Sequence, residues 1–127
     1  MSWARVGRPI TRPEKIELEK TFQGQLMEAI RSKFGPNVWI YKTNDVQVGI
    51  PNLIICFFGH FVAVEIKRAN IPTSRAKPAY NDPDLTNPQR SNIIKINKAG
   101  GSAFVGREIF AVVEKLEKIQ VALQMLT

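Results

Sequence analysis

Two apolar runs separated by a Gly-His pair constrain the fold of this chain more than any other feature. Residues 53–58 (LIICFF) and residues 61–67 (FVAVEIK) are rich in β-branched and aromatic side chains, which favour strands. A two-residue connection that begins with glycine is typical of a β-hairpin with a type II′ turn. We therefore predict an antiparallel hairpin in the middle of the chain, with Gly59 and His60 as its turn.

This turn fixes which residues face one another across the hairpin. It places Asn52 opposite Lys67 and Ile54 opposite Glu65. Because side chains alternate between faces along a strand, Asn52, Glu65 and Lys67 share one face at the open end of the hairpin. The pattern alone leaves two interpretations. The commoner is a Glu–Lys pair at the solvent boundary, and the other is a site where carboxylate and amide oxygens hold a hard divalent cation.

The rest of the chain predicts helices around further strands. The expected order is α-β-β-β-α-β-α, an α/β fold with a central mixed sheet flanked by helices. Residues 1–12 form a basic arm, and residues 69–84, which hold three prolines, form a flexible loop. The expected helices run from Pro13 to the Gly35-Pro36 stop, from a cap at Thr86 or Asn87 to Gly100-Gly101, and over residues 108–126, with strands at residues 38–42 and 102–106 beside the hairpin.

Several side chains are expected in the core. Trp39 and Tyr41 flank an isoleucine in a strand pattern, which favours burial over a role in base stacking. Cys56 is expected to be an inert buried thiol. Three isoleucines of the second helix are expected to face inward, namely Ile93, Ile94 and Ile96.

Composition limits the class of protein. A chain of 127 residues fits one domain over its whole length, and its net charge of +7 favours polyanionic partners. The longest apolar run is far shorter than a membrane span, so we expect no membrane association. The single cysteine and the lack of an apolar leader at the N-terminus predict a cytoplasmic location.

At this point the sequence resembles a known family. Residues 49–52 (GIPN) followed by residues 64–67 (VEIK) look like the split PD…(D/E)xK signature of restriction-endonuclease-like nucleases. The fuller resemblance is to the virus-type replication-repair nuclease (VRR-NUC) domain, of the type that stands alone in phages. It covers roughly residues 14–110, and its further motifs are Glu19 ahead of Phe22-Gln23, LTNPQ at 85–89 and AGG at 99–101.

The resemblance implies a metal-dependent DNA endonuclease that hydrolyses phosphodiester bonds. It assigns Mg²⁺ or Mn²⁺ to Glu65, the backbone carbonyl of Ile66, Asn52 and Glu19. It also implies structure-selective cleavage of branched DNA, such as four-way (Holliday) junctions, by a homodimer. The implied catalytic residues are Lys67, Glu65, Asn52 and Gln89.

Asn52 departs from the family pattern, which has aspartate there. A neutral amide removes one negative charge from a site whose metal affinity depends on charge. We therefore expect this chain to be an impaired or silenced nuclease. The alternative is a catalytically inactive DNA-binding module of the same fold. A protein-interaction domain is a third class. Asp45 is a weaker candidate to replace the missing carboxylate.

Basic residues gather around the expected site. Between residues 65 and 98, seven basic residues outnumber three acidic ones. They are either a solvated surface or contacts to the phosphate backbone, in which case binding depends strongly on salt and reads shape rather than sequence. The residues assigned to DNA binding are Lys67, Arg68, Arg75, Lys77 and Arg90.

Overall fold

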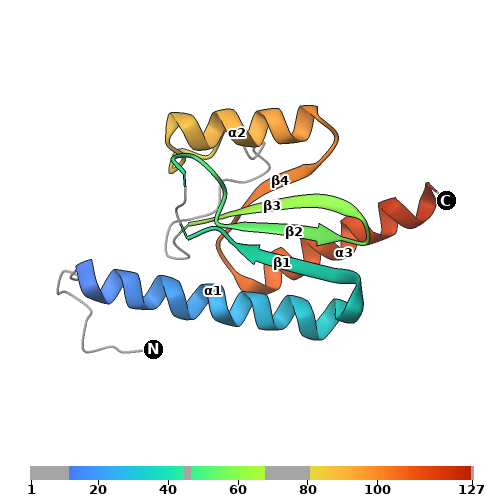
Figure 1. The fold of residues 1–127 in the computed structure, drawn as a ribbon, viewed down its shortest axis with the longest axis horizontal. Coiled ribbons are helices and arrows are strands. Elements are labelled where there is room, and N and C mark those ends of the chain that lie inside the picture. The colour runs from blue at the N-terminus through green and yellow to red at the C-terminus, as the bar shows by residue number, and fades with distance from the viewer. Residues whose placement is uncertain (1–11, 45–46, 68–80, 127) are drawn as a thin grey trace.

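A four-stranded mixed sheet organises the molecule (Figure 1). The computed structural model describes the backbone of residues 12–44, 47–67 and 81–126, and the side chains of residues 21–44, 47–67 and 81–126. The elements follow in the order α1 (Arg12–Phe34), η2 (Gly35–Asn37), β1 (Val38–Lys42), β2 (Leu53–Phe57), β3 (His60–Ile66), α2 (Asn87–Lys98), β4 (Ser102–Gly106) and α3 (Ile109–Met125).

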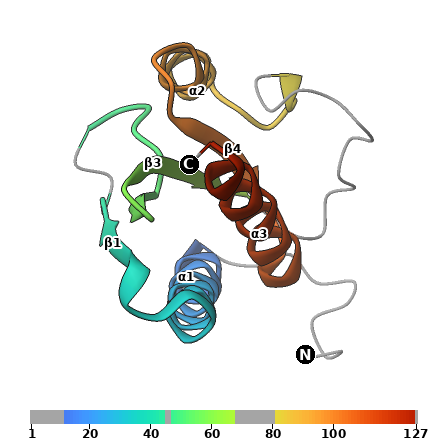
Figure 2. The same ribbon diagram turned by 90° about the vertical axis from the view of Figure 1, so that its right-hand side faces the viewer.

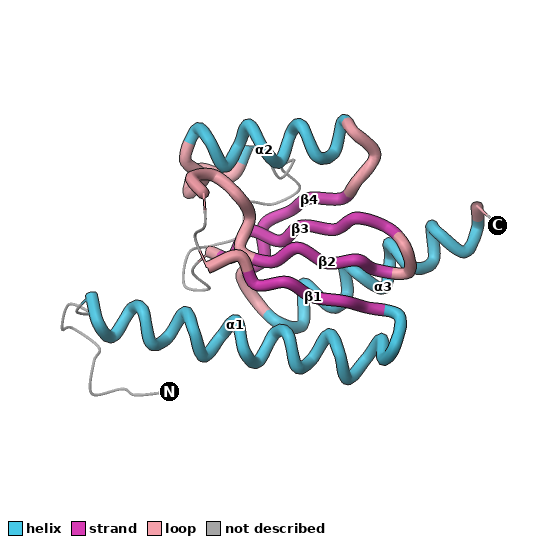
Figure 3. The backbone as a smooth tube through the Cα atoms, viewed as in Figure 1, coloured by secondary structure: helices cyan, strands magenta, loops and turns pink. Residues whose placement is uncertain are grey.

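Strand order follows chain order, β1-β2-β3-β4 (Figure 3). The first three strands are antiparallel neighbours, whereas β4 runs parallel to β3. A parallel neighbour needs a long crossover, and the segment containing α2 supplies it. The predicted α/β class, the mixed sheet and the element order are confirmed. The first helix begins one residue before the predicted start, inside the residues 1–12 that we expected to form an arm.

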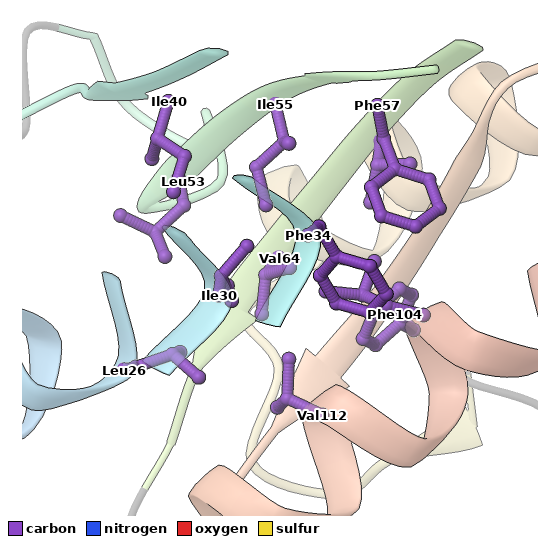
Figure 4. Close-up of a cluster of buried hydrophobic side chains, with 12 residues drawn as sticks. Leu26, Ile30, Phe34, Ile40, Leu53, Ile55, Phe57, Val64, Phe104 and Val112 are labelled. Carbon is purple, nitrogen blue, oxygen red and sulfur yellow. The ribbon is translucent and has the colours of Figure 1, made fainter. Parts of the chain in front are cut away.

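Helices cover both faces of the sheet. Figure 2 shows α2 on one side and α1 with α3 on the other. The larger core lies between the sheet and the α1–α3 pair (Figure 4), and joins Leu26 and Ile30 of α1 to Ile55, Val64 and Val112. The smaller core lies under α2 and consists of Ala63, Leu85, Ile93 and Ala103.

The hairpin turn differs from the prediction. The strands pair as Phe57 with His60 and Leu53 with Val64, so Phe58 and Gly59 form the turn. Both turn residues have positive φ, 51° and 78°, as a type I′ turn requires. Phe58 tolerates this backbone because its ring packs edge-on against Phe57, with centroids 4.8 Å apart. The predicted Gly-His turn is therefore wrong by one residue.

This correction shifts the cross-strand partners by two residues. Continuing the observed pairing one step beyond Leu53 places Asn52 beside Glu65, not Lys67. An even shift preserves the alternation of side chains, so Asn52, Glu65 and Lys67 still share a face. That face is the α2 side of the sheet, because neighbouring Ala63 lies in the core under α2.

Four residues predicted in the core are exposed. Trp39 is 62% exposed, Tyr41 46% and Ile94 37%, and Cys56 is also exposed. Ile94 lies on α2 itself, next to buried Ile93. For the other three the cause is that α2 packs mainly over β3 and β4 and reaches only Ile54 of β2. Within the described ranges, no helix packs over the same face of β1. No helix in the described part of the chain is both long and apolar enough to span a bilayer.

Candidate active site

Three elements meet where β3 ends. Glu65 is the penultimate residue of β3, Lys67 directly follows the strand, and Gln89 lies in the first turn of α2. Glu65 is 4% exposed, and a carboxylate is almost never buried to this extent unless it is paired. The Lys67 ammonium nitrogen lies 3.8 Å from Glu65 Oε2, and its side chain is 18% exposed. The cluster therefore combines a buried carboxylate with an ammonium group that reaches solvent.

Gln89 joins these two charged groups. Its Oε1 accepts a hydrogen bond of 2.9 Å from Lys67 Nζ, and its Nε2 donates one of 3.2 Å to Glu65 Oε2. A lysine can only donate and an ionised carboxylate can only accept, so these two contacts fix the orientation of the amide. Gln89 holds Lys67 and Glu65 in one hydrogen-bonded cluster.

The start of α2 explains why Gln89 is placed so well. Thr86 is the N-cap, and its Oγ1 accepts from the Gln89 backbone N–H at 3.3 Å. Gln89 Oε1 in turn accepts from the Thr86 backbone N–H at 2.9 Å. This reciprocal capping box satisfies two backbone donors and orients the glutamine side chain. The sequence predicted the cap and the site glutamine separately, and the structure shows that one residue does both.

Asn52 connects the three antiparallel strands at the same edge. Its Oδ1 accepts a 2.6 Å hydrogen bond from the Ile66 backbone N–H, and its carbonyl accepts from Thr43 N–H at 2.9 Å. Buried Thr43 also donates its hydroxyl to the Pro51 carbonyl at 2.9 Å. The Asn52 oxygen thus extends the β2–β3 ladder beyond the last paired residues and faces the backbone next to Glu65.

The segment before Asn52 packs against α2. The Gly49 carbonyl accepts a 2.8 Å hydrogen bond from Asn92 Nδ2. Gly49 has φ of 84°, and a Cβ at this position would lie 2.7 Å from Pro88 Cβ. Only glycine allows this backbone and this close approach together. The contact ties the segment that carries Asn52 to the helix that carries Gln89.

A buried ion cluster that the sequence did not predict lies at the segment that leads into α2. Arg107, directly after β4, donates through Nη2 to both carboxylate oxygens of Asp82 at 2.7 Å and to Asp84 Oδ2 at 2.8 Å. Arg107 and Asp82 are 5% and 6% exposed. The only sequence signal was the Asp-Pro-Asp turn, in which Asp82 Oδ1 accepts from the Asp84 N–H.

The environment of Asp82 perturbs its ionisation. Burial acts to raise the pKa of Asp82, but hydrogen bonds from the Asp84 backbone and Arg107, with the positive charges of Arg107 and Lys67, lower it overall. Burial acts to lower the pKa of Arg107, and its bonds to Asp82 and Asp84 raise it overall. Both groups are therefore held in their charged forms.

Comparisons with known proteins bear on this arrangement. No protein-family model matches the sequence, and no curated protein matches it. A solved structure described as a VRR_NUC domain matches with a TM-score of 0.50 and 22% sequence identity, over 74% of this chain and 92% of that chain. The chain has the fold of a VRR_NUC domain. The expected restriction-endonuclease-like architecture is thereby confirmed at the level of fold.

The VRR_NUC fold brings together part of the predicted residue set. Asn52, Glu65, the Ile66 backbone and Lys67 meet at one edge, together with Gln89. Arg90 instead donates to the Asp82 carbonyl at 3.1 Å and to Asn87 Oδ1 at 3.2 Å, beside the ion cluster. Glu19 lies in α1, but its side chain is outside the described residues. Also outside them are Asp45, Arg68, Arg75 and Lys77.

The oxygen ligands available on this VRR_NUC fold could hold a weakly bound Mg²⁺ or Mn²⁺ ion. Among residues whose side chains are described, no three Asp, Glu, His or Cys residues converge. Mg²⁺ often binds through one or two carboxylates and fills its remaining positions with waters and substrate phosphates. Glu65 supplies one buried carboxylate, and the Asn52 amide oxygen lies at the backbone N–H of the next residue, Ile66. An ion at this edge would therefore depend strongly on the phosphate that it binds.

Proposed function

We propose that this protein is a metal-dependent DNA endonuclease that hydrolyses phosphodiester bonds, with its activity reduced by Asn52. The observation that carries the proposal is the Glu65–Gln89–Lys67 cluster at the end of β3. A buried carboxylate and a positioned ammonium on a VRR_NUC fold suit hydrolysis of a phosphodiester.

In this proposal Glu65, the Ile66 carbonyl, Asn52 and Glu19 hold Mg²⁺ or Mn²⁺. Such an ion, when bound, would supply activation of a water molecule and neutralisation of phosphate charge. Lys67 orients the attacking water and stabilises the negative charge that develops on the phosphate. The hydrogen bond to Gln89 uses one of the three ammonium protons, which leaves two for water or phosphate. Gln89 keeps that ammonium within reach of the carboxylate.

Asn52 weakens this site without distorting it. Aspartate and asparagine have nearly the same shape, and either side-chain oxygen can accept from the Ile66 N–H. The missing feature is a second negative charge to attract the cation. The neutral residue also favours a second candidate function, an inactive DNA-binding module with the same fold.

The substrate and assembly complete the proposal. We propose branched DNA, including four-way junctions, bound through its phosphates by Lys67, Arg68, Arg75, Lys77 and Arg90. A homodimer would present two equivalent sites to two strands, and a chain of 127 residues is small for enclosing a junction alone. The expected setting is the cytoplasm, including that of a phage-infected host.

The test compares the protein with its Asn52→Asp variant on four-way, single-stranded and duplex DNA, with Mg²⁺, Mn²⁺ or a chelator. We expect weak or absent cleavage by the protein, metal-dependent cleavage of branched DNA by Asn52→Asp, and loss of cleavage when Lys67→Ala is added. Binding without cleavage by Asn52→Asp would identify the inactive module. If that variant neither binds DNA at low salt nor cuts it, the proposed function is wrong.

A further inference from the structure

An exposed aromatic pair lies on the same face of the sheet as the candidate active site. Trp39 and Tyr41 of β1 are 62% and 46% exposed. Their rings are nearly parallel, with an interplanar angle of 4° and centroids 6.2 Å apart. Phe61 of β3, in the same cross-strand row as Trp39, is 45% exposed. Exposed aromatic rings in such a group are a common mark of a binding surface.

The strand register places this pair relative to the active site. Tyr41 pairs with Ile54, which pairs with Ala63, two residues before Glu65 on β3. Strand spacing and rise then put the Tyr41 Cα about 12 Å from that of Glu65, and the Trp39 Cα about 16 Å away. Stacked nucleotides rise about 3.4 Å each, so these distances correspond to roughly four or five nucleotides, and fewer in an extended strand.

Charge favours a nucleic acid on this surface. The chain carries a net charge of +7. Asn92 of α2 faces the segment that follows β1, since its side chain donates to the Gly49 carbonyl. Lys95 lies three residues further along, on the same flank of α2 and exposed. A strand that crosses from the active site to β1 would pass between Lys95 of α2 and the exposed aromatic pair.

We propose that Trp39 and Tyr41 form a base-stacking platform for unpaired nucleotides of the DNA strand whose phosphate lies at Glu65 and Lys67. The position of that strand rests on the proposed function. Unpaired bases offer free ring faces, whereas bases in a duplex already stack on their neighbours, so the platform selects substrates with a single-stranded segment. Stacking of this kind tolerates any base, which suits recognition by structure.

The first test uses the fluorescence of Trp39. The chain has two tryptophans, and Trp3→Phe leaves Trp39 as the only one. A chelator prevents cleavage while this variant is titrated with a thymidine 12-mer or with an abasic 12-mer that has the same phosphates. We expect saturable quenching by the thymidine strand, at concentrations well below those at which the abasic strand binds.

The second test removes the platform. Trp39→Val keeps a strand-forming residue at an exposed position, and we expect it to weaken thymidine-strand binding at least about fivefold while changing abasic binding less than twofold. Gln25→Ala, at an exposed position of α1, is the control and should bind as the parent protein does.

The outcomes separate this inference from the proposed function. Equal affinity for the two strands, or no change in Trp39 emission, overturns the platform and leaves the cleavage assays of Asn52→Asp unaffected. If Trp39 emission is quenched as the protein concentration rises in the absence of DNA, the surface binds a second copy of the chain. That outcome also overturns the platform. Quenching by thymidine with no cleavage by any variant supports the platform and counts against the nuclease.

Discussion

At the scale of single residues, Gln89 has two roles that are usually separate. Its amide oxygen accepts from both Lys67 and the Thr86 backbone, and its amide nitrogen donates to Glu65. The first contact belongs to the candidate site, the second to the helix cap. Folding of α2 therefore orients the site, because the rotamer that closes the capping box also reaches the two charged groups.

Two substitutions separate these roles. Gln89→Ala and Thr86→Ala each break the capping box, and each should lower the free energy of unfolding by about 1 kcal/mol. Only Gln89→Ala also removes the bridge between Lys67 and Glu65, so in the Asn52→Asp background it should slow cleavage by about 10–100-fold. Denaturant melts and initial cleavage rates measure the two effects. Equal rates for both variants would refute a positioning role for Gln89.

At the scale of elements, the buried ion cluster fixes where α2 begins. Asp82 and Asp84 precede α2, and Arg107 directly follows β4. Their contacts therefore join the segment before α2 to the end of β4. Removal of one partner from a buried pair is strongly destabilising, because the remaining charge loses its compensation. The cluster therefore fixes the segment that leads into the helix carrying Gln89.

The lowered pKa of Asp82 gives this cluster a pH dependence. The folded protein binds the Asp82 proton less tightly than the unfolded chain, so the stabilisation is full well above pH 3.8 and is lost as pH falls through the folded pKa. Asp82→Asn should cost about 3 kcal/mol at pH 7, with the difference shrinking below pH 4. Asp84→Asn, at a more exposed carboxylate, should cost less. A constant difference from pH 7 to pH 3 would contradict this account.

Substitutions at two glycines test the contact between α2 and the segment that precedes β2. Gly49 and Gly59 both have positive φ, but only Gly49 has neighbours that a Cβ would meet. Gly59→Ala should cost about 1–2 kcal/mol through backbone strain alone. Gly49→Ala should cost more, and should also slow cleavage by Asn52→Asp protein because it displaces the segment that holds residue 52. Equal unfolding free energies for the two variants would show that the close approach to Pro88 is unimportant.

Helices and strands could be predicted from the sequence where local chemistry decides them, but contacts between distant residues could not. The bounds of β1 and β4 and the shared face of Asn52, Glu65 and Lys67 follow from composition and alternation. The sequence narrows the cap of α2 to Thr86 or Asn87, and the structure has Thr86. The hairpin turn was misplaced because Phe58 adopts a positive φ that sequence preference assigns to glycine or asparagine.

The exposure of β1 side chains and the ion cluster could not be predicted, because both depend on packing between distant parts of the chain. The exposure of Trp39 depends on where α2 lies over the sheet, which no pattern within β1 encodes. The partners of Arg107 are 23 and 25 residues away along the chain.

At the scale of the whole molecule, the two faces of the sheet have different environments. The α1–α3 side is packed into a continuous core, while the α2 side carries the candidate site and the exposed aromatic pair. The α3 helix and its C-cap also carry exposed apolar side chains, namely Phe110, Val121, Met125 and Leu126. Exposed apolar side chains of this size favour contact with another surface, and a second copy of the chain fits the proposed homodimer.

The assembly is tested by the mass in solution. We expect the protein at tens of micromolar to sediment as a dimer, at twice the 14.3 kDa of one chain. Val121→Glu places a charge on the exposed face of α3 and should shift the mass to that of the monomer, whereas Gln25→Glu, at an exposed position of α1, should leave it unchanged. Because two sites on one dimer act on two strands, the monomeric variant in the Asn52→Asp background should nick one strand of a four-way junction without completing the paired cut. A wild-type protein that stays monomeric at about 100 µM would contradict the homodimer and leave the active-site proposal intact.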